Sequence, residues 1–185
     1  MQEAVAAVDP PEVVDTGPLL LRRGTVDDAE PLATAIAESL EHLTPWMPWA
    51  SPQTATLTAQ TARLSKIGWG PVDYDYLMVA GGSRVVGGCG LHRRIGPTGL
   101  EIGYWVHVSH TRLGYATAAA RALTRTALSL PGVERVEIHC DEGNAASAGV
   151  PRRIGYRLDR VEDHSIDSPA QTGRFMIWVM DTPGF

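Results

Sequence analysis

Cysteine and long apolar runs are scarce in this sequence of 185 residues. The two cysteines, Cys89 and Cys140, cannot form a disulfide framework, and no Cys/His spacing matches a zinc or haem site. Because each lies in an apolar run, we expect both to be small buried residues in strands. No apolar run approaches the ~18 residues needed to cross a bilayer, and the N-terminus lacks a signal-peptide pattern. We therefore expect a cytoplasmic protein without membrane contact.

Positive charge is also limited. Of the sixteen basic residues only Lys66 is a lysine, the arginines are scattered, and the formal net charge is −5. Binding to a nucleic-acid backbone depends on clustered cations. The sequence therefore predicts no nucleic-acid partner.

The hydrophobic content of 44% is enough for one domain with a substantial core. We expect that single domain to span residues 18–185. Residues 1–17 are acidic, contain proline and show no periodicity, so they are predicted to form a flexible leader. The segment 163–173, DHSIDSPAQTG, is predicted to be a mobile loop by its composition.

Periodicity and turn residues predict alternating helices and strands along the rest of the chain. Helices are expected from Thr25 to Leu43, where Pro45 and Pro48 follow, at 53–67, after residue 114, and near 144–154. Strands are expected at 19–23, 74–80, 84–93, 100–108, 133–140, 155–163 and 173–181, the second and third forming a hairpin around Gly81-Gly82-Ser83. This order predicts an α/β fold with a mixed central sheet of about seven strands and helices on both faces.

The stretch from Glu101 to Leu130 carries the clearest functional signal. It reads as a buried strand, a glycine-containing turn and an alanine-rich amphipathic helix. A helix start has free backbone N–H groups and a positive dipole end, so the turn at 111–116 can bind a diphosphate. An ordinary strand-to-helix turn would have the same pattern.

Three segments closely resemble the GNAT superfamily of acyl-CoA-dependent N-acetyltransferases, in particular its RimJ/RimL-like branch. They are LLLRRGTVDDAEPLATAIAESLEHLTPWMPWA, LEIGYWVHVSHTRLGYATAAARAL and VERVEIHCDEGNAASAGVPRRIGYRLD, and the resemblance covers roughly residues 18–181. It implies a GNAT fold whose sheet splays between the fourth and fifth strands, 100–108 and 133–140. It also implies acetyl-CoA as co-substrate, with succinyl-CoA or another acyl-CoA left open, an amine acceptor and no metal.

The resemblance places the coenzyme A pyrophosphate on the hexapeptide TRLGYA. The family pattern has Gln or Arg at its first place, where this chain has Thr111, so that anchor departs from the pattern. Gly114 is expected to matter most, because a side chain there would block the approach of backbone to phosphate. The residues expected to bind here are Thr111, Arg112, Leu113, Gly114, Tyr115 and Ala116.

The preceding strand is expected to hold the pantetheine arm and the thioester. If the sheet splays, the N–H groups of Trp105, Val106, His107 and Val108 are freed and can bind amides and polarise the thioester carbonyl. An intact buried strand would fit the same alternation of residues.

Two proton transfers are needed for amine acetylation, one from the acceptor ammonium and one to the departing thiolate. Glu101 is the predicted base and shares a strand face with Trp105, about 13 Å away, so a proton would pass through water. Glu101 could instead be a solvated carboxylate that attracts a cationic acceptor. His107, on the same face, is the reserve base.

Asn144 and Ser147 match an Asn-x-x-Ser element that the family places beside the pantetheine arm. Asn144 could pair with a pantetheine amide, and Ser147 could protonate the sulfur. Both residue types are also good helix caps, which is the alternative interpretation. Pro151 predicts that the helix here begins near Ser147 or is kinked.

The acceptor side is predicted from the loop PWMPW, where Trp46, Met47 and Trp49 follow the first helix and, with Glu101, would line the acceptor groove. Core packing of one tryptophan is an alternative. The last strand, Phe175–Met180, is apolar on both faces, which suggests a possible homodimer interface.

The resulting hypothesis is a cytoplasmic enzyme that transfers an acetyl group directly from acetyl-CoA to a primary amine. The expected acceptor is a protein N-terminal α-amine. A small-molecule amine, such as an antibiotic, an amino sugar or an amino acid, and a non-catalytic acyl-CoA-binding protein are the alternatives.

Overall fold

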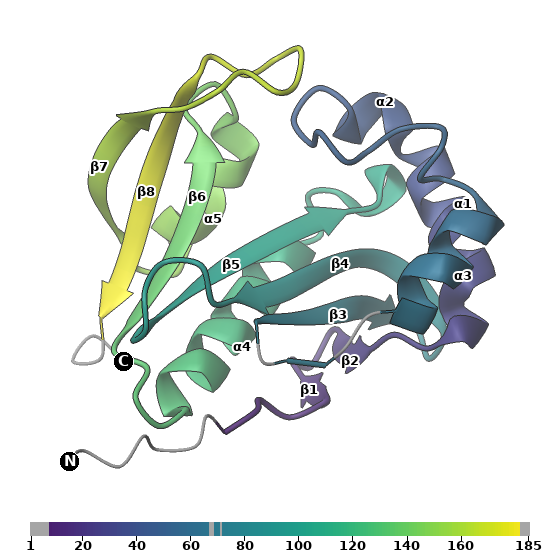
Figure 1. Cartoon of the computed structure of the whole chain (residues 1–185), viewed down its shortest axis with the longest axis horizontal. Coiled ribbons are helices and arrows are strands. Elements are labelled where there is room, and N and C mark those ends of the chain that lie inside the picture. Colours follow the sequence, from purple (N-terminus) through teal and green to yellow (C-terminus); the bar gives the residue numbers. More distant parts are fainter. Residues whose placement is uncertain (1–7, 67–68, 71, 182–185) are drawn as a thin grey trace.

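The computed structural model describes residues 8–66, 69–70 and 72–181, which form one mixed sheet covered by helices (Figure 1). The strands are β1 Val13–Asp15, β2 Leu20–Arg23, β3 Asp73–Ala80, β4 Arg84–His92, β5 Gly99–Val106, β6 Arg135–Asp141, β7 Arg157–Asp163 and β8 Arg174–Asp181. The helices are α1 Ala29–Glu38, α2 Leu40–Leu43, α3 Leu57–Lys66, α4 Tyr115–Ser129 and α5 Ala145–Arg153, with 3₁₀ turns η1 Val26–Asp28 and η2 Val108–His110. The predicted α/β fold with a mixed sheet is confirmed.

The sheet has eight strands in the order β1-β2-β3-β4-β5-β6-β8-β7, one more than expected. The additional strand is β1, which pairs antiparallel with β2 inside the segment predicted to be a flexible leader. Two buried tyrosines of β3 hold the segment before it, since Tyr74 Oη donates to Asp9 at 2.7 Å and Tyr76 Oη donates to the Pro11 carbonyl at 2.8 Å. The leader prediction is therefore wrong for residues 13–15, and residues 1–7 lie outside the described part.

The predicted helix from Thr25 to Leu43 is interrupted. An Arg22–Asp28 ion pair of 2.6 Å and the bond from the Thr25 N–H to Asp28 fix its start, and Arg22 holds the pKa of the Asp28 carboxyl below its usual range. α1 ends at Glu38 and α2 begins at Leu40, so the fully buried Ser39 lies at the break. The helix predicted at 53–67 starts later, at Leu57, and residue 67 is not described.

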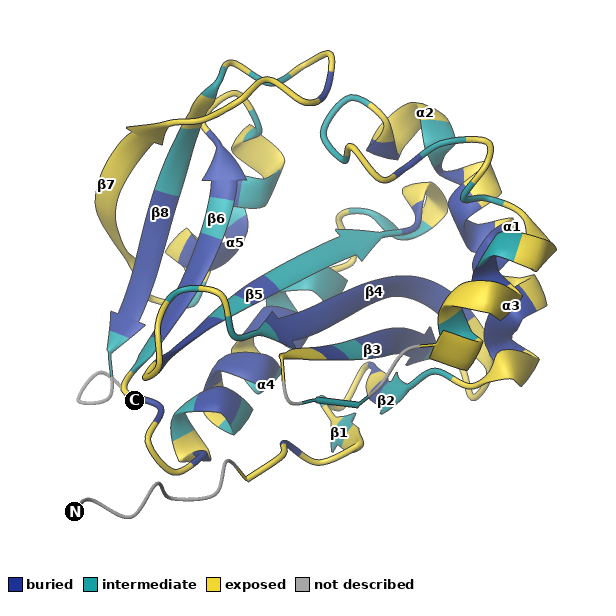
Figure 2. Ribbon diagram, in the orientation of Figure 1, coloured by how far each residue is buried: buried dark blue, intermediate teal, exposed yellow. Residues whose placement is uncertain are grey.

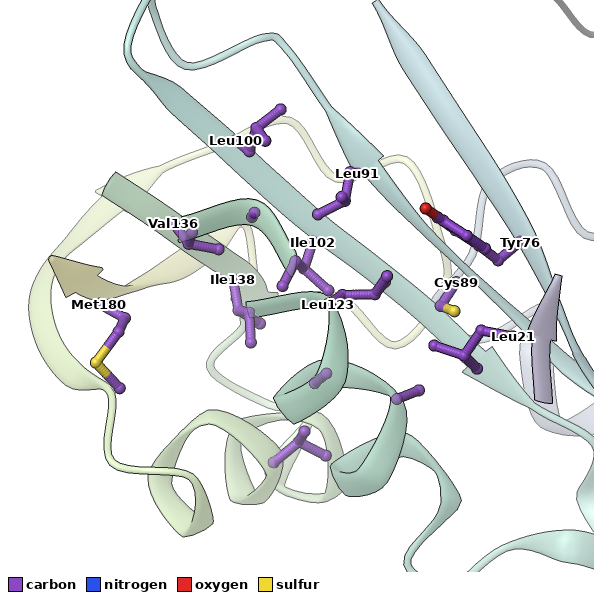
Figure 3. Close-up of a cluster of buried hydrophobic side chains, with 14 of the residues drawn as sticks. Leu21, Tyr76, Cys89, Leu91, Leu100, Ile102, Leu123, Val136, Ile138 and Met180 are labelled. Atoms are coloured by element: carbon purple, nitrogen blue, oxygen red, sulfur yellow. The ribbon is translucent and has the colours of Figure 1, made fainter. Parts of the chain in front are cut away.

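The core lies on both faces of the sheet. The larger cluster is formed by strands β2 through β6 together with α4 and α5. Figure 3 shows Leu91, Ile102, Leu123 and Ile138, from four of these elements, packed together. Cys89 and Cys140 belong to this cluster, each 6% exposed, as predicted. A smaller cluster places α1 against β3 and β4 on the opposite face. Each helix of the described chain is too short or too polar to cross a membrane.

The sheet opens between β5 and β6, as predicted. The two strands pair in parallel only where Gly99–Glu101 faces Arg135–Glu137, although β5 continues to Val106 and β6 to Asp141. Figure 1 shows the two strands diverging from this short contact. The opening places the later halves of both strands at the edges of a gap.

The closing strand β8 lies between β6 and β7, with β7 at the edge. Figure 2 shows β8 mostly buried and β7 exposed along its length. Burial within one chain explains why β8 is apolar on both faces, so this strand gives no reason to expect a dimer interface.

Candidate functional site

A cleft of about 660 Å³ lies between the turn at 111–116, the start of α5 and the open edge of β5. α4 begins at Tyr115, after Gly114 in the left-handed conformation with φ of 80°, and its first hydrogen bond runs from the Ala118 N–H to the Gly114 carbonyl. In the described part of the chain, the N–H groups of residues 113–117 have no hydrogen-bond partner. These free donors at a helix start can bind an anion.

Thr111 and Arg112 precede these free N–H groups. The Thr111 hydroxyl donates to the Val108 carbonyl at 3.0 Å, and the Thr111 N–H contacts the same carbonyl at 3.4 Å. Both donors of Thr111 are thus directed at the Val108 carbonyl, and its binding to phosphate stays a prediction. Arg112 is exposed with φ of 62° and remains beside the cleft.

The amides of β5 are only partly free. The His107 N–H donates to the Val86 carbonyl at 2.9 Å, and the Val108 N–H donates to Ser39 Oγ at 3.1 Å. The N–H groups of a strand alternate between its two edges, so Trp105 also points toward β4 while Tyr104 and Val106 point toward the gap. The prediction of four free amides therefore holds only for Val106, and Tyr104 was missed.

His107 cannot act as the reserve base in this geometry. Its side chain is buried, its Nε2 lies 2.8 Å from Glu38 Oε2, and its Nδ1 accepts from the Ser109 N–H. Both ring nitrogens are occupied, and the residue lines neither cleft described here.

The start of α5 forms the other wall of the gap. Asn144 caps the helix, since its Oδ1 accepts from the Ser147 N–H at 3.0 Å, which confirms the capping interpretation. Pro151 lies inside α5 and has no N–H for the carbonyl of Ser147, four residues earlier. Tyr104 Oη satisfies that carbonyl at 3.1 Å and lies 3.3 Å from Ser147 Oγ. The proline thus creates a contact that ties β5 to α5 across the opening.

A second cleft of about 570 Å³ lies on the other side of β5, bounded by the loop 45–49. Trp46, Met47 and Trp49 line it, and Trp49 packs edge-on against Trp105 with ring centroids 5.9 Å apart. Six residues line both clefts, so the clefts meet at the gap between β5 and β6. The shared residues are Trp46, Met47, Tyr104, Trp105, Asn144 and Ser147.

The loop 163–173 is attached to this second cleft. The Ala170 N–H donates to the Pro45 carbonyl, and the Gln171 side chain donates to the Trp46 carbonyl. Asp141, at the end of β6, accepts from the N–H groups of Gly143, Thr172 and Gly173 and from the Thr172 hydroxyl. Burial alone would raise the pKa of Asp141, but these hydrogen bonds outweigh it and lower the pKa. The composition of the loop suggested mobility, whereas the structure attaches residues 170–173 to the cleft wall and to Asp141.

The floor of the second cleft carries charged side chains from neighbouring strands. Glu101 lies 3.5 Å from Arg94 and 3.7 Å from His139 Nδ1, and His139 Nε2 lies 2.5 Å from the buried Glu137. The cleft also includes His92, which faces Glu101 across the β4–β5 pairing. His92 and His139 were missed, because their placement on the Glu101 face depends on the register of β5 with β4 and with β6, which the predicted hairpin of 74–80 with 84–93 does not fix.

The cysteine near the gap is not activated. Cys140 is buried behind Ser147, and burial raises the pKa of its thiol to about 11. Its thiol therefore stays protonated at neutral pH, which fits a packing role.

Comparisons with known proteins agree with this geometry. Residues 18–157 match the family model described as Acetyltransferase (GNAT) domain. A Bacillus subtilis (strain 168) protein named Uncharacterized N-acetyltransferase YjdG is 34% identical over 76 residues, 40% of this chain and 45% of that protein. The chain thus matches less than half the length of this curated relative.

Two solved structures illustrate the fold similarity. Mycobacterium smegmatis RimJ in complex with CoA-disulfide has a TM-score of 0.81 at 19% identity, over 96% of this chain and 88% of that one. RimL, the ribosomal L7/L12 α-N-protein acetyltransferase in complex with coenzyme A, has a TM-score of 0.82 at 18% identity, over 94% of this chain and 100% of that one.

Proposed function

Because the chain belongs to the GNAT acetyltransferase family, we propose that it transfers an acetyl group from acetyl-CoA directly to a primary amine. The observation that carries the proposal is the meeting of two clefts at the gap between β5 and β6. One cleft offers free amides to a phosphate, and the other offers carboxylates to an ammonium group. A thioester in the gap would be reached from both sides.

In this proposal the donor cleft holds coenzyme A through main-chain groups. The pyrophosphate binds the amides of Leu113, Gly114, Tyr115 and Ala116, with Arg112 adding charge. The amides of Tyr104 and Val106, which face the gap, bind the pantetheine arm, and Asn144 lies beside it. The RimJ structure is a complex with CoA-disulfide and the RimL structure a complex with coenzyme A, which supports the choice of donor.

Ser147 is the proposed acid for the departing thiolate. Its hydroxyl lines both clefts and lies 3.3 Å from Tyr104 Oη, whose pKa is raised by burial. The phenol proton is directed at the Ser147 carbonyl, so Tyr104 Oη can accept from the serine hydroxyl and hold it at the gap.

The proposed acceptor is a protein N-terminal α-amine. Trp46, Met47 and Trp49 would form the walls around the first residues of the peptide, and Glu101 would attract the ammonium. The named activity of RimL, an α-N-protein acetyltransferase, supports this choice over a small-molecule amine.

An acceptor screen tests the proposal. Purified protein is incubated with acetyl-CoA or succinyl-CoA and with N-terminal peptides, amino acids, amino sugars and aminoglycosides, and mass spectrometry detects acylated products. We expect acetylated peptide α-amines and release of free thiol. Acetylation of small amines alone would replace the acceptor class, whereas binding of acetyl-CoA by calorimetry without thiol release would favour a non-catalytic acyl-CoA-binding protein.

A further inference from the structure

Beyond the proposed function, on which it rests, we infer that His92 takes the proton from the acceptor ammonium, with Asp73 orienting its ring. The two side chains come from adjacent strands, β4 and β3, and their residues face each other in the sheet. His92 Nδ1 lies 2.6 Å from Asp73 Oδ1. This contact places the ring proton on Nδ1 and leaves the lone pair on Nε2.

The position of the ring follows from two glycines. A Cβ at Gly90 would lie 2.9 Å from both Cε1 and Nε2 of His92, and a Cβ at Gly103 would lie 3.4 Å from Nε2. The imidazole therefore lies over the Gly90–Gly103 pair, in space that side chains would fill elsewhere in a sheet. Its Nε2 has no hydrogen-bond partner among the residues the structure describes, and His92 lines the acceptor cleft.

This position is closer to the gap than Glu101 is. The strand register pairs His92 with Glu101, Gly90 with Gly103 and Gly88 with Trp105. The ring extends from the first pair to the second, so Nε2 lies about two residues, roughly 7 Å, nearer Trp105 than the Glu101 backbone. Glu101 is weakened as a base by its separation of about 13 Å from Trp105, and His92 Nε2 has a shorter distance to Trp105.

Asp75 provides a holding group for the ammonium next to His92. The same Gly90 Cβ position lies 3.0 Å from Asp75 Oδ1, so this oxygen and His92 Nε2 both lie close to Gly90, and both residues line the part of the acceptor cleft above it. Arg63 pairs with the other oxygen, Oδ2, at 3.0 Å and leaves Oδ1 available. An ammonium in that space can contact a carboxylate and the basic nitrogen together.

The other groups in the cleft suit this role less well. Each ring nitrogen of His139 faces a carboxylate, Glu137 or Glu101, and Glu101 itself lies between Arg94 and His139. A base needs an unoccupied lone pair directed at its substrate. We therefore assign Glu101 to attraction of the acceptor and His92 to proton transfer.

The proposed step balances as follows. His92 Nε2 takes one proton from the ammonium, and the freed nitrogen lone pair forms the C–N bond with the thioester carbonyl carbon. The C–S bond then breaks and its electron pair stays on sulfur, while Ser147 gives its hydroxyl proton to the thiolate and takes the second nitrogen proton in return. His92 returns its proton to water, so the products are the acetamide, coenzyme A and one released proton.

The test uses the best peptide from the acceptor screen and measures thiol release. We expect His92→Gln to lower kcat/KM by about 100-fold or more, the range of a lost general base, while the Kd for acetyl-CoA changes less than about twofold. The matched substitution His139→Gln should cost less than about tenfold. Unchanged acetyl-CoA binding shows that each variant is folded.

Two further readouts separate a base from a packing residue. The pH dependence of kcat/KM should differ in shape between the native protein and His92→Gln, and imidazole should restore part of the rate to His92→Ala. An unchanged pH profile, or a larger loss for His139→Gln than for His92→Gln, would overturn the assignment. If no amine is acetylated by the native protein, the proposed function fails together with this role, whereas turnover that is insensitive to His92 overturns the inference alone.

Discussion

The two clefts that meet at the opened sheet are built in different ways. The donor cleft relies on main-chain groups, the unpaired amides of residues 113–117 at the start of α4. The proposed acceptor cleft relies on side chains from several strands, including Asp75, His92, Glu101 and His139. A main-chain site depends on local conformation, whereas a side-chain site depends on strand register. Substitutions should therefore affect the two clefts differently.

The largest expected effect tests the acceptor cleft through Gly90, a residue without a side chain. In Gly90→Ala the new Cβ would lie 2.9 Å from the His92 ring and 3.0 Å from Asp75 Oδ1, so the ring must move. A displacement of about 1 Å at a catalytic group can cost about 100-fold in rate. We expect kcat/KM to fall by about that factor while the acetyl-CoA Kd stays within about twofold.

Gly103→Ala is the matched control for Gly90→Ala. Its Cβ would lie 3.4 Å from His92 Nε2, a contact that a small shift relieves, so the loss should be less than about tenfold. Equal losses in both variants, or a weaker Kd for acetyl-CoA, would contradict the separation of the two clefts.

The next effect concerns the wall of the acceptor cleft at Asp141. Its folded pKa is depressed, so its contribution to stability is complete above the usual carboxyl pKa and is lost as pH falls through the folded value. Asp141→Asn should lower the free energy of unfolding by about 2 kcal/mol at pH 7, since hydrogen bonds to a charged group are weakened.

Thermal unfolding of both proteins between pH 7 and pH 3 measures this contribution. The stability difference between native protein and Asp141→Asn should shrink as the pH falls. Other carboxylates with lowered pKa, such as Asp28, titrate in both proteins and cancel in the comparison. A difference that stays constant to pH 3 would show that the Asp141 charge does not hold the loop.

A tenfold effect is expected in the donor cleft from Gly114→Ala. Gly114 has φ of 80°, and its Cβ position is open in the absence of a ligand, so alanine adds backbone strain and fills space beside the free amides. We expect the acetyl-CoA Kd to rise about tenfold, by calorimetry, with a loss of about 1 kcal/mol in stability.

Gly132→Ala separates strain from binding. Gly132 has φ of 78°, an equally open Cβ position and lies in the turn after α4, away from the cleft. Its stability loss should match that of Gly114→Ala, with no change in Kd. If both variants weaken acetyl-CoA binding alike, the turn at Gly114 does not contact the donor.

These contrasts explain which parts of the site could be predicted from sequence. The free amides near Gly114 follow from a strand, a turn and a helix that are adjacent in the chain, so local reasoning was sufficient. The hydroxyl and N–H of Thr111 are both directed at the Val108 carbonyl, an orientation that residue type does not indicate. The opening between β5 and β6 was available only through family resemblance.

His92 was missed for a different reason. Its alignment with Glu101 depends on the β4–β5 register, and the space for its ring depends on Gly90 and Gly103 in two strands. The strand at 13–15 was missed for a similar reason, since the segment before it is held by Tyr74 and Tyr76, 65 residues away from their partners. Long-range pairing, which composition does not encode, decides both features.

The smallest expected effect concerns the contact that joins the clefts. Tyr104→Phe removes the donor to the Ser147 carbonyl and should destabilise the protein by about 1 kcal/mol, because that carbonyl loses its partner.

Pro151→Ala would supply the helical N–H that the Ser147 carbonyl lacks, so this substitution should stabilise Tyr104→Phe more than it stabilises the native protein. Loss of the proline ring affects both backgrounds and cancels in a double-mutant cycle. Denaturant unfolding of the four proteins should give a coupling of about 1 kcal/mol, and a coupling near zero would mean that the tyrosine does not replace the missing helical bond.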